Sequence, residues 1–123
     1  MPRCRSRLAR LWGAGRDHAH QRQAVVEAGA DAGDHFAEHG WQAITVALLV
    51  NPLELPRLAG LPAYLARRGS RLGLTVDSLA GARVVADLDL DVWIKVDTGY
   101  GRTGVPWNSG EKLRTILNEI KSP

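Results

Sequence analysis

Apolar residues gather in three short runs, at residues 44–50, 72–76 and 92–96. The first run is almost continuously apolar and rich in β-branched residues, which is typical of a strand buried on both faces of a parallel sheet. The other two runs are followed or closed by a Val-Asp pair, Val76-Asp77 and Val96-Asp97. The pattern predicts three strands, the first of them central in its sheet.

The segment after the first run has the spacing of an amphipathic helix. It begins at Asn51, which can cap a helix, and its leucines and Tyr64 fall at mixed three- and four-residue spacings. Pro56 and Pro62 interrupt the segment, so we expect a kinked helix or two short ones that end near Gly69.

Two more helices are predicted further along the chain. Asp77 or Ser78 can cap one over residues 79–86, and Asn108 or Ser109 can cap the other. The apolar positions of the last helix are Leu113, Ile116, Leu117 and Ile120.

The order strand, helix, strand, helix, strand, helix is typical of parallel strands with right-handed helical crossovers, hence of an α/β layer or barrel. A complete (β/α)8 barrel needs about 250 residues, whereas the chain has 123. The sequence therefore predicts a partial (β/α)8 TIM barrel of about three βα units. Such a piece leaves apolar strand edges unpaired, and self-association through these edges is expected.

The first 33 residues have no steady apolar period, and only residues 23–30 could form a short helix there. Residues 35–39 resemble the last turn of a helix that Gly40 stops. We therefore divide the chain into residues 1–33, a poorly ordered or non-native segment, and residues 34–123, a partial barrel. A shifted reading frame or a misassigned start upstream of about Asp34 is one hypothesis for this contrast.

The composition is that of an ordinary soluble globular protein, with 45% hydrophobic and 24% charged residues. The single cysteine, Cys4, excludes an internal disulfide bond and a cysteine-rich zinc site, which predicts a reducing, cytoplasmic location. No apolar run approaches the roughly 20 residues that cross a bilayer, so no membrane partner is expected. Five of the thirteen arginines lie in the first sixteen positions, where an organellar presequence or a nucleic-acid-binding arm is an alternative to a poorly ordered tail. We favour the tail, and no nucleic-acid partner is expected.

The segment with the most chemical information, KVDTGYGRTGV, runs from Lys95 to Val105. A predicted strand ends there at Asp97, and three glycines follow at positions 99, 101 and 104. Glycines let a backbone turn sharply and approach a ligand closely, and ligands of parallel α/β folds bind at the carboxyl ends of the strands. Arg102 therefore carries a permanent positive charge on the expected ligand side.

The three glycines also match the G-x-G-x-x-G fingerprint of dinucleotide-binding folds. That fingerprint has its third glycine in the first turn of a helix, whereas residues 105–108 separate Gly104 from the next predicted helix. A non-catalytic α/β domain that binds a nucleotide or another anion at the glycine-rich loop is the alternative function. A plain turn with a surface arginine is also compatible with these residues.

The segment from Lys95 to Val105 resembles the strand and loop shared by the N-terminal barrel of alanine racemase and its relatives, the D-threonine aldolases and D-serine dehydratases. Residues 44–47, 51–58 and 74–78 resemble the aldolase and dehydratase branch in order and spacing. The likeness covers roughly residues 35–108. It implies a fold type III barrel that uses pyridoxal phosphate and, in the parent family, a lyase that acts on a small D-amino acid.

The resemblance also implies roles for two residues. The arginine that matches Arg102 hydrogen-bonds the phenolic oxygen of the cofactor ring, and the lysine that matches Lys95 helps to position this arginine. Arg102 and Lys95 are thus the expected cofactor-binding residues. The residues themselves leave open a second interpretation of Lys95, as a strand-end lysine that reaches solvent.

The chain also departs from the family. The family binds its cofactor as a Schiff base through a lysine on the first barrel strand, and this chain has no lysine before Lys95. The later phosphate-binding strands and the metal-bearing C-terminal domain of the aldolase and dehydratase branch are not matched either. We therefore expect a fragment of a pyridoxal-phosphate-dependent D-amino-acid lyase that has no catalytic residue of its own, does not retain the cofactor and is inactive alone.

Two further patterns have simpler explanations. Residues 35–39, HFAEH, match the H-x-x-E-H arrangement of zinc proteases. Only one turn of helix is predicted there, and the third ligand would have to be a distant carboxylate such as Glu111, so no metal is expected. Asp77 and Asp97 could form a catalytic carboxylate pair, but both precede turns with free amides, which favours strand-end caps.

Overall fold

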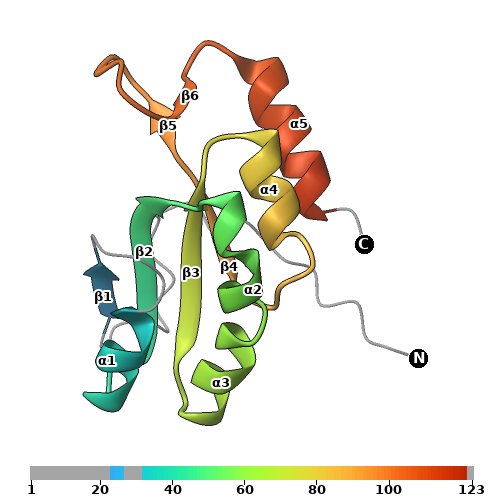
Figure 1. The fold of residues 1–123 in the computed structure, drawn as a ribbon. Coiled ribbons are helices and arrows are strands. Elements are labelled where there is room, and N and C mark those ends of the chain that lie inside the picture. Colours follow the sequence, from blue (N-terminus) through green and yellow to red (C-terminus); the bar gives the residue numbers. More distant parts are fainter. Residues whose placement is uncertain (1–22, 27–31, 122–123) are drawn as a thin grey trace.

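The structure is a computed structural model that describes residues 23–26 and 32–121. Its main sheet has four parallel strands, which Figure 1 shows side by side. They are β1 (Gln23–Val26), β2 (Ala43–Leu49), β3 (Arg71–Val76) and β4 (Asp91–Ile94).

Each strand pairs with the next one along the chain, so the order β1-β2-β3-β4 contains no reversal. A (β/α)8 barrel is built by adding strands in this way. A doubly wound dinucleotide-binding sheet, in contrast, reverses its strand order at a switch point. The described sheet is therefore a section of a barrel wall, and the predicted α/β class and partial barrel are confirmed.

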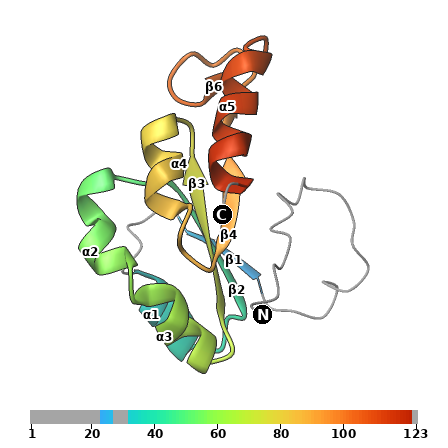
Figure 2. The same ribbon diagram turned by 90° about the vertical axis from the view of Figure 1, so that its right-hand side faces the viewer.

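Helical segments connect the strands, and Figure 2 shows α1 to α4 on one side of the sheet. A short parallel pair of strands lies between β4 and the last helix. The helical segments are α1 (Ala32–Glu38), the 3-10 turn η2 (Pro52–Glu54), α2 (Leu55–Leu58), α3 (Leu61–Arg67), α4 (Leu79–Val85) and α5 (Gly110–Lys121). The short strands are β5 (Val96–Asp97) and β6 (Val105–Pro106).

The predicted interruption between β2 and β3 is confirmed. The side-chain oxygen Oδ1 of Asn51 accepts a hydrogen bond from the Leu53 amide at 3.0 Å, which caps the first turn. The chain then forms η2, α2 and α3 instead of one long helix, because a proline within a helix lacks the amide hydrogen that the preceding turn needs. Gly69, with φ of 76°, follows the end of α3 as predicted.

Two expectations about the early part of the chain need correction. Residues 23–26 form β1 and not the start of a short helix, because β2 provides partners for their backbone groups along the whole strand. In addition, α1 begins at Ala32, so the boundary drawn after residue 33 falls inside a helix. The remainder of the segment before it lies outside the described residues.

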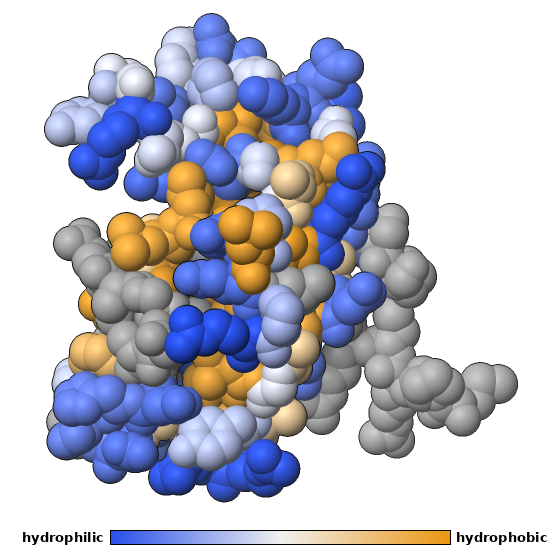
Figure 3. Space-filling view, in the orientation of Figure 1, coloured by the Kyte–Doolittle hydropathy of each residue, from blue (hydrophilic) through white to orange (hydrophobic). Residues whose placement is uncertain are grey.

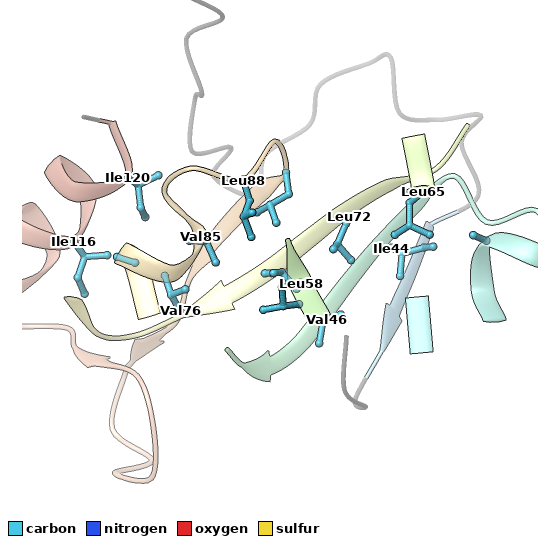
Figure 4. Packing of buried hydrophobic residues seen from close by; sticks show 14 of the residues in the cluster. Ile44, Val46, Leu58, Leu65, Leu72, Val76, Val85, Leu88, Ile116 and Ile120 are labelled. Atoms are coloured by element: carbon cyan, nitrogen blue, oxygen red, sulfur yellow. The ribbon is translucent and has the colours of Figure 1, made fainter. Parts of the chain in front are cut away.

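The strands bury their helix-facing side. Ile44 and Val46 of β2 and the alternate residues of β3 point toward the helices, where Leu58 of α2 and Leu65 of α3 pack against them (Figure 4). The expectation that the first run is buried on both faces was wrong, since Thr45 is only half-buried and Leu48 is 51% exposed. The core lies in one layer, between the sheet and its helices.

The opposite face of the sheet carries Thr45, Gly73 and Trp93, each one residue away from a helix-facing neighbour. A Cβ atom at Gly73 would lie 2.9 Å from the indole nitrogen of Trp93 and 3.2 Å from the hydroxyl of Thr45. Glycine therefore makes room for the tryptophan ring. The indole nitrogen itself is buried without a hydrogen-bond partner among the described residues.

The outer strands of the described sheet are β1 and β4, each with one neighbour. Their free edges offer backbone donors and acceptors to another strand. Self-association through these edges stays a prediction.

Removing side-chain volume from the core tests this packing. Leu65 is fully buried, so Leu65→Ala should lower the free energy of unfolding by about 2–5 kcal/mol. Leu53→Ala makes the same chemical change at a residue that is 87% exposed and should change it by less than about 0.5 kcal/mol. Urea unfolding measures both, and equal losses for the two variants would contradict the burial of Leu65 in the core.

Candidate functional site

The glycine-rich loop, residues 98–104, lies at the carboxyl end of the sheet, near the top of Figure 1. Two backbone hydrogen bonds close its base. The Val105 amide donates to the carbonyl oxygen of Lys95 at 2.8 Å, and the Trp107 amide donates to that of Asp97 at 2.9 Å. These bonds make β5 and β6 a parallel pair. These bonds hold the two ends of the loop together, just after the end of β4.

Asp97 holds the first half of the loop. Its carboxylate oxygen Oδ1 accepts a hydrogen bond from the Gly99 amide at 2.9 Å, and the Gly101 amide donates to both carboxylate oxygens at 3.1 and 3.0 Å. The bond from Gly99, then that from Gly101, lowers the pKa of Asp97 below its ordinary value of 3.8, because these donors favour the ionised carboxylate. Lys95 makes a smaller contribution in the same direction.

Asp77 holds the second half of the loop from a different strand. It directly follows β3, and its Oδ2 accepts a hydrogen bond from the amide of Gly104 at 2.9 Å, across 27 positions of sequence. From the sequence, Asp77 or Ser78 is expected to cap the following helix. In the structure Ser78 caps α4, accepting from the Gly81 amide at 3.1 Å, which leaves the carboxylate of Asp77 to bind the loop.

Gly104 lies against the backbone of β5. A Cβ atom at this position would be 2.8 Å from the Asp97 nitrogen and 3.1 Å from the Val96 carbonyl carbon. Its φ of 107° is also outside the range that other residues adopt readily. Only glycine lets the two backbones come this close.

The loop presents Arg102 to solvent. The central carbon of its guanidinium lies 5.5 Å from the centroid of the Tyr100 ring, within the range of a cation–π contact. Tyr100 is itself 84% exposed. In Figure 3 this end of the molecule is mostly hydrophilic, whereas hydrophobic residues lie over the middle. The positive charge of Arg102 is therefore accessible at the carboxyl end of the strands, where barrels bind their ligands.

Lys95 lies at the base of the loop, between β4 and β5, and is half-buried. Its backbone amide donates to the Val76 carbonyl oxygen at 2.9 Å, so that the ends of β3 and β4 are held together. Strand alternation from Asp91 through Trp93 puts Lys95 on the sheet face opposite the helices. Among the residues that the structure describes, it is the one lysine on the sheet; Lys112 and Lys121 belong to α5.

The glycine amides of the loop are not free for an anion. The amides of Gly99, Gly101 and Gly104 all donate to carboxylates, so they cannot also bind a phosphate. The third glycine also precedes the start of α5 at Gly110 by six residues, as the sequence analysis predicted. The loop therefore differs in structure from a dinucleotide-binding turn, and its available positive group is a guanidinium.

The two aspartates act as caps of the loop. Asp77 and Asp97 accept hydrogen bonds from the same glycine-rich segment; Asp97 caps the turn that follows it, as the sequence favoured, whereas Asp77 does not cap the turn that follows it. The sequence signal that the two aspartates share is the Val-Asp pair, which occurs at both positions. What sequence reasoning missed is that Asp77 binds the loop of the neighbouring strand.

The two histidines that begin and end the H-x-x-E-H pattern contact each other. The rings of His35 and His39 lie 4.4 Å apart, and Nδ1 of His39 is 2.7 Å from the carbonyl oxygen of His35. Figures 1 and 2 show α1 and α5 at opposite ends of the sheet, so Glu111 is not brought near these histidines. Within the described ranges, no group of three or more histidine, cysteine or acidic residues is placed to hold a metal.

A groove of about 500 Å³ lies between the start of α4 and the start of α5. Asp77 and Ser78 form one wall, and Glu111 and Lys112 contribute to the other. Sequence reasoning did not find this groove, because its walls come from segments 30 or more residues apart. Asp77 thus lies between the groove and the arginine loop.

The comparisons with known proteins give a structural likeness. No protein-family model matches the sequence, and neither does any curated protein. Three solved structures match. The D-threo-3-hydroxyaspartate dehydratase from Delftia sp. HT23 is 29% identical with a TM-score of 0.65, over 78% of this chain and 26% of that one. A C353A mutant of a D-threo-3-hydroxyaspartate dehydratase, in its metal-free form, is 28% identical with a TM-score of 0.67, over 85% of this chain and 28% of that one.

The third match is an alanine racemase-like protein from Idiomarina loihiensis, 26% identical with a TM-score of 0.64, over 79% of this chain and 26% of that one. The chain therefore spans about a quarter of the length of these neighbours. They belong to the fold type III, alanine racemase-like group that the sequence resembles, so the resemblance stated from the sequence is confirmed. As a separate finding, no helix in the described ranges is both long and apolar enough to span a bilayer.

Substituting the loop glycines tests the close approach of backbones. Gly104→Ala should lower the free energy of unfolding by about 2 kcal/mol or more, because the added carbon meets the Asp97 backbone and φ is strained. Gly101→Ala is the matched control: its φ of 75° is left-handed, but its Cβ would meet open space. It should lose only about 1 kcal/mol. Denaturant unfolding gives both values, and the opposite order would contradict the loop geometry.

Lowering the pH should loosen the first half of the loop. Because the pKa of folded Asp97 is lowered, the stabilisation by its carboxylate is present above the unfolded pKa of about 4 and disappears as the pH falls through the folded value. Amide signals of Gly99 and Gly101 in NMR spectra should therefore shift together below about pH 4. Asp97→Asn should remove this transition, and its persistence in that variant would assign it to another group.

Proposed function

We propose that the chain is part of a pyridoxal-phosphate-dependent D-amino-acid lyase of the D-threonine aldolase or D-serine dehydratase type. In this proposal Arg102 binds the phenolic oxygen of the cofactor ring. The observation that carries it is the exposed guanidinium at the carboxyl end of a barrel section, on a loop whose glycine amides are already bound by carboxylates.

The residues fit one part of the cofactor. A phenolate is a single oxygen anion on a flat ring, and a guanidinium donates to such an oxygen in a fixed direction. When bound, pyridoxal phosphate supplies an electron sink for bond breaking at an amino acid. The task of Arg102 would be to keep the phenolic oxygen ionised. Tyr100, which lies beside the guanidinium, would limit the directions in which it can move.

Lys95 would support this arrangement from below the loop. Lys95 lies at the start of the segment that carries Arg102, and its charge favours the ionised form of Asp97. In the proposal Lys95 helps to keep the loop in place and thereby positions Arg102. Lys95→Met should therefore weaken binding at Arg102 without abolishing it.

The residues do not fit the covalent part of the cofactor site. The first strand of the described sheet, QAVV, has no lysine, and no lysine precedes Lys95 in the sequence. We therefore propose that this chain by itself has no catalytic lysine, does not hold the cofactor covalently and does not perform the parent reaction. The neighbouring dehydratase suggests a D-amino acid with a 3-hydroxyl group as the substrate class of the parent enzyme.

A pair of small ligands tests the role of Arg102 without a Schiff base. 3-Hydroxypyridine carries the phenolic oxygen and pyridine lacks it, so only the first should shift the loop signals of the chain in NMR titrations. Arg102→Ala should weaken this response about threefold to tenfold, a modest effect because the guanidinium is exposed. Arg114→Ala removes an exposed arginine of α5 and should leave the response unchanged.

Two results would contradict the proposal. One is an equal response to 3-hydroxypyridine and pyridine, or an equal response in the chain and in Arg102→Ala. The other is ATP binding that depends on Arg102 in a chain that ignores 3-hydroxypyridine, which would favour the nucleotide-binding alternative.

The covalent part has its own readout. Mixed with pyridoxal phosphate, the chain should show no specific absorbance band near the visible edge, because no lysine precedes Lys95 to bind the cofactor from the first barrel strand. The band should appear when a first barrel strand with a lysine is added to the chain by fusion. A strong, stoichiometric band in the chain alone would show that one of its own lysines holds the cofactor.

A further inference from the structure

We infer that Asp77 is a positioning residue for Arg102: its carboxylate, at the end of β3, fixes the second half of the loop that the next strand carries. The importance of Arg102 is taken from the proposed function. The contact between Asp77 and Gly104 is independent of it.

The ends of β3 and β4 are adjacent, which brings Asp77 within reach of the loop. The Lys95 amide donates to the Val76 carbonyl oxygen, so the residue before Asp77 is bound to the residue that opens the loop segment. The Asp77 carboxylate is therefore close enough to accept a hydrogen bond from the Gly104 amide at 2.9 Å. The bond therefore joins two neighbouring strand ends.

Gly104 is held on two sides. On one side it lies against the β5 backbone, so close that a Cβ atom on it would be 2.8 Å from the Asp97 nitrogen. On the other side its amide is bound by Asp77. Arg102 is two residues earlier in the chain, so the direction of its backbone depends on this fixed point.

The two halves of the loop have separate supports. Asp97 binds the amides of Gly99 and Gly101, which precede Arg102, and Asp77 binds that of Gly104, which follows it. An arginine fixed on one side alone could swing with the free half of the loop. The hydrogen bonds to Asp97 and Asp77 together restrict Arg102 to one region at the carboxyl end of the sheet.

In this inference the side-chain oxygen of Asp77 is needed as a hydrogen-bond acceptor, and its negative charge strengthens the bond. A backbone amide needs an acceptor, and a carboxylate forms a stronger bond than a neutral oxygen does. Asparagine keeps an acceptor at the same place, whereas alanine removes it. Because Asp77 also lines the groove and is half-buried, water can replace the lost acceptor, which makes the loss local and not one of the whole fold.

The test compares Asp77→Ala, Asp77→Asn and Asp89→Asn in the full chain; Asp89 is an exposed aspartate outside the site. Hydrogen exchange should accelerate about tenfold or more at the Gly104 amide in Asp77→Ala, with little change in β3 and α5. Asp77→Asn should restore most of the protection, and Asp89→Asn should resemble the unchanged chain. The response to 3-hydroxypyridine should weaken about threefold or more in Asp77→Ala and recover in Asp77→Asn.

Four outcomes decide between the explanations. Unchanged exchange at Gly104 in Asp77→Ala would overturn the inference, and so would accelerated exchange along the whole chain that Asp77→Asn fails to reverse. Local loss at Gly104 with an unchanged response to 3-hydroxypyridine would also overturn it, because the loop would then not need Asp77 to present Arg102. A chain that never responds to 3-hydroxypyridine contradicts the proposed function, and the positioning of Arg102 by Asp77 then fails with it even if the exchange result is as expected.

Discussion

The hydrogen bonds from glycine amides to the carboxylates of Asp77 and Asp97 are the interaction on which the account depends. They turn a flexible glycine-rich segment into a loop of defined shape, anchored to the ends of two neighbouring strands. Because these three glycine amides are occupied, they are not available to a ligand, whereas the exposed guanidinium of Arg102 is. The same loop sequence with free amides would be a candidate for phosphate binding.

The barrel geometry explains why these groups meet. Strands that follow one another in sequence are also neighbours in the sheet, so the residues after β3 and after β4 lie side by side at one edge. The helices bury only one face of the strands, and the tryptophan accommodated by Gly73 lies on the other. The chain spans about a quarter of the length of its structural neighbours.

Much of the fold could be predicted from the sequence, because apolar runs of five to seven residues and the prolines at positions 56 and 62 are strong local signals. The strand at residues 23–26 could not, since its four residues have no recognisable alternation and owe their conformation to pairing with β2. In the site, the glycines and Arg102 were visible as a motif. The bond between Asp77 and Gly104 was not, because a contact across 27 positions depends on how two strand ends are placed in space. The partner of Asp77 therefore had to come from the structure.

The most direct test is a nuclear Overhauser measurement on the chain in solution. The account predicts a cross-peak between the Gly104 amide proton and the β-protons of Asp77, two groups that are brought together by the loop crossing to the end of β3. The contact between the Gly81 amide and Ser78 provides an internal standard for a capping bond of similar length. If the standard is seen and the Gly104 to Asp77 cross-peak is absent, the loop is not held by the neighbouring strand and the account of the site is wrong.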